Sequence, residues 1–194
     1  MALGFDEVTN RTGVDYVDAC AAPGNKTSHL AAILANNQTP SSSGKKVKPT
    51  TVYALDRNSQ RLDGLKLRMA KMLPAEENAH IKVLPELQDF LATTPADFST
   101  CRGILLDPSC SGSGIFTALD RQADSADEEE VASRMEHLSK FQVTALKHAM
   151  TFPSVQHIVY STCSIHAQEN EKVVEQAVNA NRDDWTIVAP QCLT

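Results

Sequence analysis

The chain has 194 residues, 42% of them hydrophobic, which suits a single globular α/β domain over residues 1–194. It has no run of 18 apolar residues and no basic-then-apolar leader, so we expect no membrane span and an intracellular protein. The net charge of −6 argues, taken alone, against a nucleic-acid partner, because such proteins usually carry a basic excess. Much of the acid lies in residues 120–130, which leaves room for a basic surface elsewhere.

Apolar runs and helical patterns alternate along the chain, which predicts βαβ units in a doubly wound, mostly parallel α/β sheet. Strands are expected at 14–20, 50–56, 81–85, 103–107, 156–161 and 185–188. Helices are expected at about 25–36, after a cap at Asn58 or Ser59, across 131–149, and at 167–179. Doubly wound sheets normally continue beyond such a sixth strand, so we expect a truncated chain.

Helical spacing also predicts which side chains face the core. In the second helix these are Leu62, Leu65, Met69 and Leu73, and in the last helix Val174 and Val178. In the helix before residue 150 the register contains Val131, Met135, Leu138, Gln142, Ala145 and Ala149. The polar insert 37–49 and the acidic segment 115–132 are expected to be flexible.

The segment DACAAPGNKTS, residues 18–28, joins the first strand to its helix, where α/β folds bind small cofactors. Its small residues allow close backbone approach, and a helix N-terminus favours an anionic group. The segment lacks the phosphate-binding P-loop pattern and G-x-G-x-x-G, so a nucleoside triphosphate or dinucleotide is disfavoured. Asp56 ends the second strand, where an acidic residue binds ribose hydroxyls or, alternatively, caps the next helix. Together these features favour an adenosyl-type cofactor.

Two of the five cysteines follow neighbouring strands: Cys110 in DPSCSGSG and Cys163 in YSTCS. In a doubly wound sheet these loops are expected to converge beside the cofactor loop, and their small neighbours leave room for a planar base. Ser164 precedes an expected helix start, whose dipole can lower the pKa of Cys163. The alternative is that both are buried small hydrophobic residues, which is how we interpret the other three cysteines. No cysteine or histidine cluster has metal-site spacing, so no metal is expected.

Four ordered motifs, VDACAAPGNKTSHLAA, YALDRNSQRL, ILLDPSCSGSG and VYSTCSIHAQENE, resemble the Sun-domain RNA (cytosine-5)-methyltransferases. The resemblance covers residues 14–178 and implies a Rossmann-like, S-adenosylmethionine-dependent methyltransferase fold. Asn25, Ser109 and the segment LKHAMTFPS are most similar to one eukaryotic branch, the fifth Sun-domain member. That branch methylates a cytosine in 25S/28S ribosomal RNA, which implies an RNA partner, a monomer, and a location in the nucleus and nucleolus.

The resemblance also implies roles for individual residues. Asp56 would bind the ribose with Arg57 beside it and Arg61 in support, and Asp89 would reach the adenine. Asp107, near the methyl donor, would hydrogen-bond the target cytosine with Lys26 nearby. Cys163 would attack carbon 6 of the cytosine, and Cys110 would assist loss of the carbon-5 proton and release of the RNA. The S-adenosylmethionine loop would comprise Cys20, Ala21, Ala22, Pro23, Gly24, Asn25 and Lys26.

Two other functions remain open from the sequence. A relative of the same family could act on transfer RNA, and a cofactor-binding scaffold could carry both cysteines as structural residues. The chain departs from most of the family because Pro108 stands one position further from Cys110, a variant that the eukaryotic branch shares. Against the family pattern we expect a chain truncated at both ends, without the N-terminal RNA-binding region and with the last two strands of the sheet cut short.

Overall fold

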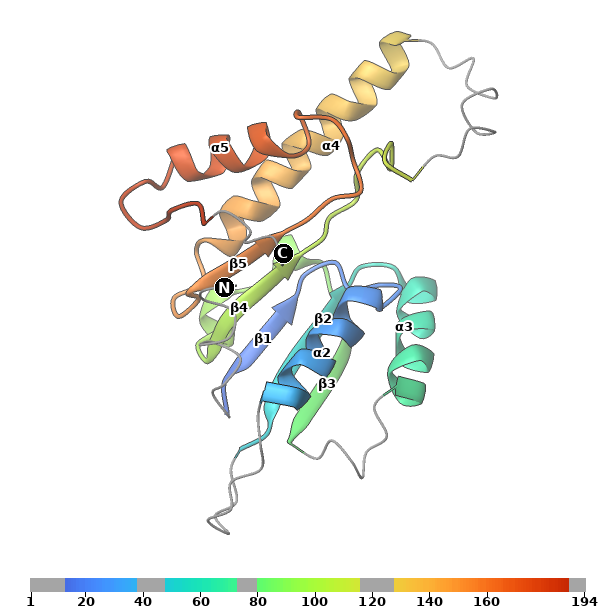
Figure 1. The fold of residues 1–194 in the computed structure, drawn as a ribbon, viewed down its shortest axis with the longest axis vertical. Helices are drawn as coiled ribbons and strands as arrows, with labels where there is room; N and C mark the ends of the chain where they lie inside the picture. The colour runs from blue at the N-terminus through green and yellow to red at the C-terminus, as the bar shows by residue number, and fades with distance from the viewer. Residues whose placement is uncertain (1–12, 38–47, 73–79, 116–127, 189–194) are drawn as a thin grey trace, which may run out of the picture. The chain divides into compact units, whose positions relative to one another are not determined.

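The computed structural model describes residues 13–37, 48–72, 80–115 and 128–188. Strands and helices alternate in it, as the sequence predicts (Figure 1). Their order is β1 (Asp15–Asp18), α2 (Asn25–Asn37), β2 (Thr50–Asp56), α3 (Ser59–Met72), β3 (Ile81–Leu87), the short 3-10 helices η1 (Phe90–Ala92) and η2 (Pro95–Phe98), β4 (Cys101–Leu106), α4 (Glu128–Ala149), β5 (His157–Tyr160) and α5 (Glu171–Asn179).

The five strands form one sheet in the order β3-β2-β1-β4-β5. β1 pairs in parallel with both β2 and β4, and β2 pairs in parallel with β3. The chain therefore adds β2 and β3 on one side of β1 and then adds β4 and β5 on the other. This reversal defines the doubly wound, Rossmann-like class, in which ligands bind at the carboxyl ends of the strands where the order switches. The predicted fold class is confirmed.

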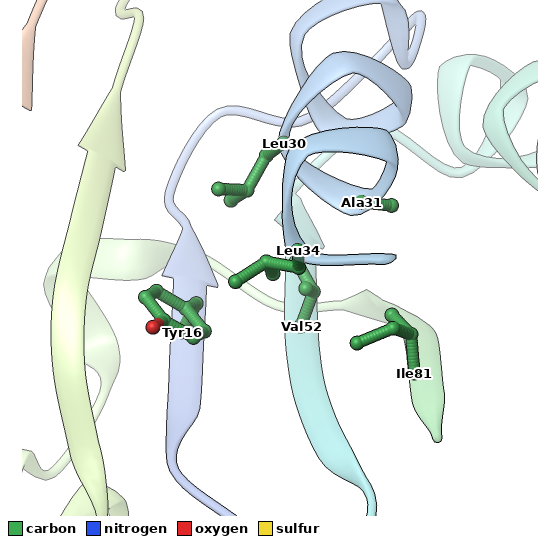
Figure 2. Close-up of a cluster of buried hydrophobic side chains, with 6 residues drawn as sticks. All are labelled: Tyr16, Leu30, Ala31, Leu34, Val52 and Ile81. Atoms are coloured by element: carbon green, nitrogen blue, oxygen red, sulfur yellow. The ribbon is translucent and has the colours of Figure 1, made fainter. Parts of the chain in front are cut away.

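One face of the sheet is covered by α2 and α3. Leu30, Ala31 and Leu34 of α2 pack on Tyr16, Val52 and Ile81, one from each of three neighbouring strands (Figure 2). Leu62, Leu65 and Met69 of α3 pack on Ala54 and on the loop after β1. Side chains alternate between the two faces of a strand, so Val52 and Ala54 present one apolar face to both helices.

The opposite face of the same unit carries aromatic side chains. Tyr53, which alternates with Val52, meets the ring of Phe98 edge-on at 5.3 Å between centroids. Phe98 and Phe90 both pack against Phe152 at 5.6 and 5.7 Å. The 3-10 helices η1 and η2 therefore close this face with two phenylalanines, Phe90 and Phe98, that are almost fully buried.

The described residues form two compact units, 13–106 with 151–159, and 107–150 with 160–188. The first holds most of the sheet with α2 and α3. In the second, α4 packs on α5, and Ala145, Ala149, Val173 and Ala177 are buried. None of the helices in the described part of the chain is both long and apolar enough to cross a membrane.

The predicted strands and helices differ from the observed ones mainly at their ends. β2 matches its prediction residue for residue, whereas β1 and β5 are shorter and β3 is longer. α5 begins at Glu171 rather than at 167, because residues 167–170 form turns. The predicted sixth strand at 185–188 is wrong: these residues have no strand pairing, and Ile187 and Val188 are exposed.

The predicted core faces are right for α3 and only partly right for the later helices. In α5 the buried positions are Val173 and Ala177, one residue before the predicted Val174 and Val178. In α4, Val131 is 47% exposed because it lies near the helix start, while Gln142, Ala145 and Ala149 are buried. Leu73, most of the insert 37–49 and residues 116–127 lie outside the described residues.

Candidate functional site

The loop after β1 is held against its own unit by backbone hydrogen bonds. The amide of Ala19 donates to the carbonyl of Leu105, and that of Ala21 donates to the carbonyl of Leu55, both at 2.9 Å. Gly24 has a φ of +98°, which glycine adopts without the steric cost of a side chain. The loop therefore turns sharply into α2 and lies along the carboxyl end of β2.

Asp56 is bonded to this loop at the end of β2. Its Oδ2 accepts from the amide of Ala22 at 3.2 Å, and its Oδ1 accepts from the amide of Asn58 at 2.8 Å. Arg61 reaches back to the same place, donating to the carbonyl of Ala22, with its Nη2 3.7 Å from Asp56 Oδ2. Asn58, and not Asp56, caps α3 by accepting from the amide of Arg61 at 3.0 Å. The capping alternative for Asp56 is therefore wrong, and its carboxylate joins the loop to β2.

The hydrogen-bond acceptors of this unit fit an adenosyl group with ribose hydroxyls. A carboxylate offers about four acceptor positions, and the two amide donors on Asp56 leave acceptor capacity for hydroxyl donors. Lys26 and Arg57 are exposed beside the same strand ends. Asp89 is also exposed, and it caps η1 by accepting from the amide of Leu91 at 2.9 Å. Its predicted contact with adenine stays a prediction.

The second unit brings Cys110 and Cys163 together. Their Sγ atoms lie 3.1 Å apart, and both residues are half-buried free thiols. They belong to two segments that we call the Cys110 loop (107–114) and the Cys163 loop (161–166). The interpretation of both residues as fully buried packing groups is wrong, because each retains partial exposure beside the other.

Side chains and backbone tie these two loops together. Asp107 Oδ1 accepts from the hydroxyl of Ser161 at 2.8 Å, directly after the two strands end. At the far end of the Cys110 loop, the amide of Gly114 donates to the carbonyl of Cys163 at 2.9 Å. A side chain on Gly114 would place its Cβ 2.8 Å from that same oxygen, so this approach requires glycine. The backbone of Cys163 is therefore held in place by a residue of the Cys110 loop.

The electrostatics of Cys163 differ from the sequence expectation. Burial, the hydrogen bond with Cys110, and the charges of Cys110 and Asp107 raise the pKa of Cys163 to about 11. The expected helix dipole does not act on it, because α5 begins at Glu171, eight residues later. In this state Cys163 is a protonated thiol at neutral pH, and activation requires removal of its proton.

A buried carboxylate that the sequence interpretation missed lies behind the Cys110 loop. Glu169 is fully buried, and its Oε1 accepts from the amide of Ser111 at 2.9 Å while its Oε2 accepts from the Ser111 hydroxyl. Gln142 of α4, also fully buried, donates to Glu169 Oε1 at 3.1 Å and to the carbonyl of Ser109 at 3.0 Å. The opposing effect of burial is outweighed by the hydrogen bonds from Ser111, Ser164 and Gln142, so the pKa of Glu169 is lowered and it stays ionised.

One signal for this network was present in the sequence. Gln142 stands in an otherwise apolar helical register, and a buried polar side chain requires hydrogen-bond partners. Glu169 and Asn170 gave no comparable signal, because in QENE they look like the solvated start of a helix. Asn170 donates from Nδ2 to the carbonyls of Ser164 and His166 at 2.9 and 3.0 Å and accepts from the hydroxyl of Thr162.

The remaining three cysteines lie outside the Cys110 and Cys163 loops. Cys101 is fully buried in β4, where burial raises the pKa of its thiol to about 12, as suits a packing residue. Cys20 is half-buried within the cofactor loop, and Cys192 lies outside the described residues. Among the described residues, histidine, cysteine and carboxylate side chains form no group that could hold a metal ion.

Comparison with known proteins adds family relationships to this geometry. Residues 8–192 match the family model described as 16S rRNA methyltransferase RsmB/F. The chain is 38% identical over 174 residues to the 25S rRNA (cytosine-C(5))-methyltransferase rcm1 of Schizosaccharomyces pombe, covering 88% of this chain and 34% of that protein. It is 41% identical over 172 residues to the 28S rRNA (cytosine-C(5))-methyltransferase of Mus musculus, covering 87% and 32%. The chain thus spans about a third of the length of these curated relatives.

A solved structure shows the same fold. The crystal structure of PH0851 superposes with a TM-score of 0.65 at 25% identity, and the match covers 90% of this chain and 35% of that one. The doubly wound arrangement seen here is therefore also found in a known protein.

Proposed function

Since the chain belongs to the RsmB/F family of ribosomal RNA methyltransferases, we propose that its protein methylates carbon 5 of a cytosine in large-subunit ribosomal RNA. The observation that carries the proposal is the 3.1 Å approach of the Cys110 and Cys163 sulfur atoms. Two half-buried thiols in contact suit a reaction in which one thiol forms a bond to the base and the other assists in breaking it. A scaffold would not need such a pair.

The proposed methyl donor is S-adenosylmethionine, which supplies an electrophilic methyl group when bound. Asp56 supports this choice, because its buried carboxylate keeps acceptor capacity for ribose hydroxyls while the amide of Ala22 holds it in place. The loop residues from Cys20 to Lys26 would surround the amino-acid part, and Arg61 would keep Asp56 and the loop together. Arg57 and Asp89 complete the proposed set.

The chemistry at the base begins with Cys163. Its thiolate adds to carbon 6 of the cytosine, a sulfur–carbon bond forms, and the electron pair of the 5,6 double bond moves to carbon 5. Carbon 5 then takes the methyl group as the bond from that methyl to the donor's sulfonium sulfur breaks, with its electron pair staying on that sulfur. Cys110 then accepts the proton from carbon 5, the double bond re-forms, and the sulfur of Cys163 leaves with its bonding electrons. The base must be single-stranded or turned out of its stack for this attack.

Asp107 and Lys26 have supporting roles in the proposal. Asp107 is already bonded to Ser161, two residues before Cys163, so its carboxyl group is held next to the nucleophile's loop. A carboxyl group there can balance charge at the ring nitrogen during attack. Lys26 is exposed and would contribute a positive charge to the negatively charged RNA.

The RNA and the location rest on the relatives. The two named relatives act on 25S and 28S ribosomal RNA, which favours large-subunit RNA over transfer RNA. We propose a location in the nucleus, in the nucleolus. The net charge of −6 means that attraction to RNA phosphates must come from a local basic surface and not from the overall charge of this chain. We propose a monomer acting on one cytosine at a time.

Covalent trapping tests the activity. Large-subunit ribosomal RNA transcribed with 5-fluorocytidine, incubated with S-adenosylmethionine and the full-length protein, should give a complex that survives denaturing electrophoresis, because fluorine cannot leave carbon 5 as a proton does. Cys163→Ala should give none, while Cys101→Ala should give as much as wild type. No complex with wild-type protein would support the scaffold alternative instead.

Bisulfite sequencing tests the substrate. Deletion of the gene should remove one 5-methylcytosine from large-subunit ribosomal RNA, and restoring the wild-type protein but not Cys163→Ala should bring it back. Loss at a transfer-RNA position with ribosomal positions intact would overturn the ribosomal assignment.

A further inference from the structure

Two consecutive residues, Glu169 and Asn170, bond to the two different cysteine loops. Glu169 accepts from the backbone and side chain of Ser111, next to Cys110. Asn170 bonds to Thr162 and Ser164, the residues on either side of Cys163. Neither residue is close in sequence to Cys110, and both precede α5, whose first residue is Glu171.

The position of Cys110 depends on the Glu169 carboxylate. Ser111, on one side of Cys110, bonds to Glu169 directly, and Ser109, on the other side, bonds to Gln142, which itself donates to Glu169 Oε1. Both neighbours of Cys110 are therefore held from one fully buried, ionised group. Loss of the carboxylate would leave the Ser111 amide and the Gln142 donor without this acceptor, which is unfavourable for buried polar groups.

The position of Cys163 is fixed mainly by other groups. The amide of Gly114 binds its carbonyl at 2.9 Å, and Thr162 Oγ1 accepts from the amide of Ser164 at 3.2 Å. Asn170 bonds to both flanking residues, at the Thr162 hydroxyl and the Ser164 carbonyl. Glu169 adds only a hydrogen bond from the Ser164 side chain. Removal of Glu169 should therefore disturb Cys110 more than Cys163.

We propose that Glu169 and Asn170 are positioning residues with separate duties, Glu169 placing Cys110 for release of the RNA and Asn170 placing Cys163 for attack. This rests on the proposed function, in which Cys163 forms the bond to carbon 6 and Cys110 takes the carbon-5 proton before the bond breaks. Loss of Glu169 lets methyl transfer proceed and delays release. Loss of Asn170 slows formation of the bond itself.

The test uses the full-length protein, large-subunit ribosomal RNA with ordinary cytosine, and labelled S-adenosylmethionine. Two quantities are measured in a single turnover: methyl groups transferred, and the fraction of protein in a denaturation-resistant RNA complex. Glu169→Ala should transfer methyl at a rate near wild type while the trapped fraction rises severalfold. Asn170→Ala should slow methyl transfer roughly tenfold without any rise in trapped complex.

Further variants keep the result interpretable. Glu169→Gln preserves the shape of the side chain and one acceptor oxygen, so it should fold if Glu169→Ala does not, and should trap complex to a smaller extent. Ser111→Ala removes one of the two bonds from Ser111 to Glu169 and should lie between wild type and Glu169→Ala. Glu175→Ala, an exposed glutamate of α5, is the matched control and should behave as wild type.

Cys110→Ala separates the failure of this inference from failure of the proposed function. If Cys110→Ala traps complex but no Glu169 variant does, the assignment of Glu169 to Cys110 is overturned while the function stands. If Cys110→Ala itself releases RNA normally, the role proposed for Cys110 is wrong. A loss of methyl transfer in the Glu169 variants equal to that of Asn170→Ala, without trapping, would show a common structural role for both residues.

Discussion

Cys110 and Cys163 are 53 positions apart in the sequence, yet their sulfur atoms lie 3.1 Å apart. At that distance the Cys110 thiol changes the acidity of Cys163. The hydrogen bond between the two thiols raises the pKa of Cys163, and a negative charge on Cys110 opposes a second one on Cys163. The pair is therefore held in a resting state in which Cys163 keeps its proton.

Removing Cys110 should make Cys163 more reactive toward small alkylating agents. Cys110→Ala deletes two of the causes that raise the Cys163 pKa to about 11, so the pKa should fall, although burial keeps it above that of a free cysteine. Each unit of decrease gives about tenfold more thiolate at a fixed pH. Alkylation of Cys163 by iodoacetamide at pH 8, followed by peptide mass spectrometry, should be roughly three- to tenfold faster than in wild type.

Cys101 serves as the internal reference for that measurement. It is fully buried, burial raises its pKa to about 12, and it belongs to the other unit of the chain. Its alkylation should be equally slow in both proteins. An increase at Cys101 comparable with that at Cys163 would mean that the substitution loosened the fold rather than changed the pair.

The stability provided by Glu169 should depend on pH. Its pKa is lowered in the folded protein, so the unfolded chain binds the proton more readily and stability rises with pH. The contribution should be complete above the ordinary glutamate pKa of about 4.3 and be lost as the pH falls through the lower folded value. Urea unfolding of wild type and Glu169→Gln from pH 7 to pH 3.5 should show the difference in unfolding free energy shrinking toward acid. A difference independent of pH would contradict an ionised carboxylate.

Asp56 should be required for cofactor binding. Asp56→Asn keeps the size of the side chain but replaces one of its two oxygens with a donor, although Oδ2 accepts from the amide of Ala22 and Oδ1 from the amide of Asn58. Calorimetric titration with S-adenosylmethionine should show affinity weakened roughly tenfold or more, about 1.4 kcal/mol. Asp63→Asn, an exposed residue of α3 paired with Lys66, should bind normally. Equal affinity for both variants and wild type would remove Asp56 from the site.

A side chain at Gly103 should destabilise the protein. A Cβ there would lie 3.0 and 3.2 Å from two ring carbons of Tyr16, a residue of β1 that is buried in the cluster with α2. Gly103→Ala should therefore destabilise the protein by about 1–3 kcal/mol. Gly64, in α3, has open space at the same position, so Gly64→Ala should stabilise by roughly 0.5–1 kcal/mol. Chemical denaturation compares both, and equal effects would show that the ring can move away.

The local sequence pattern predicted the fold well wherever a segment carries its own apolar run or helix cap. β2 was predicted to the residue because its apolar run ends at Asp56, and the Asn58 cap set the start of α3. The pattern failed at 185–188, whose apolar residues suggest a strand. A strand needs a neighbour to pair with, and nothing local to these four residues reports whether one exists.

The site divides in the same way. The loop after β1 and the two cysteines follow strand ends, so topology alone indicated them. The prediction of a helix dipole at Cys163 was wrong because α5 begins at Glu171 and not at residue 167. Just before that start, the side chain of Asn170 donates to the carbonyls of Ser164 and His166. Glu169 could not be recognised, since its partners come from Ser111 and Gln142, far away in sequence.

The hydrogen bonds between Glu169 and Ser111, next to Cys110, also have a consequence for folding during synthesis. A ribosome completes Cys110 and even Cys163 before it adds Glu169, and until that residue emerges the Ser111 amide lacks its carboxylate acceptor. A nascent chain, or a fragment cut before residue 169, therefore contains both sulfur atoms without the group that sets Cys110. On this geometry the Cys110 loop gains its carboxylate support only after residue 169 has been synthesised and has folded back onto it.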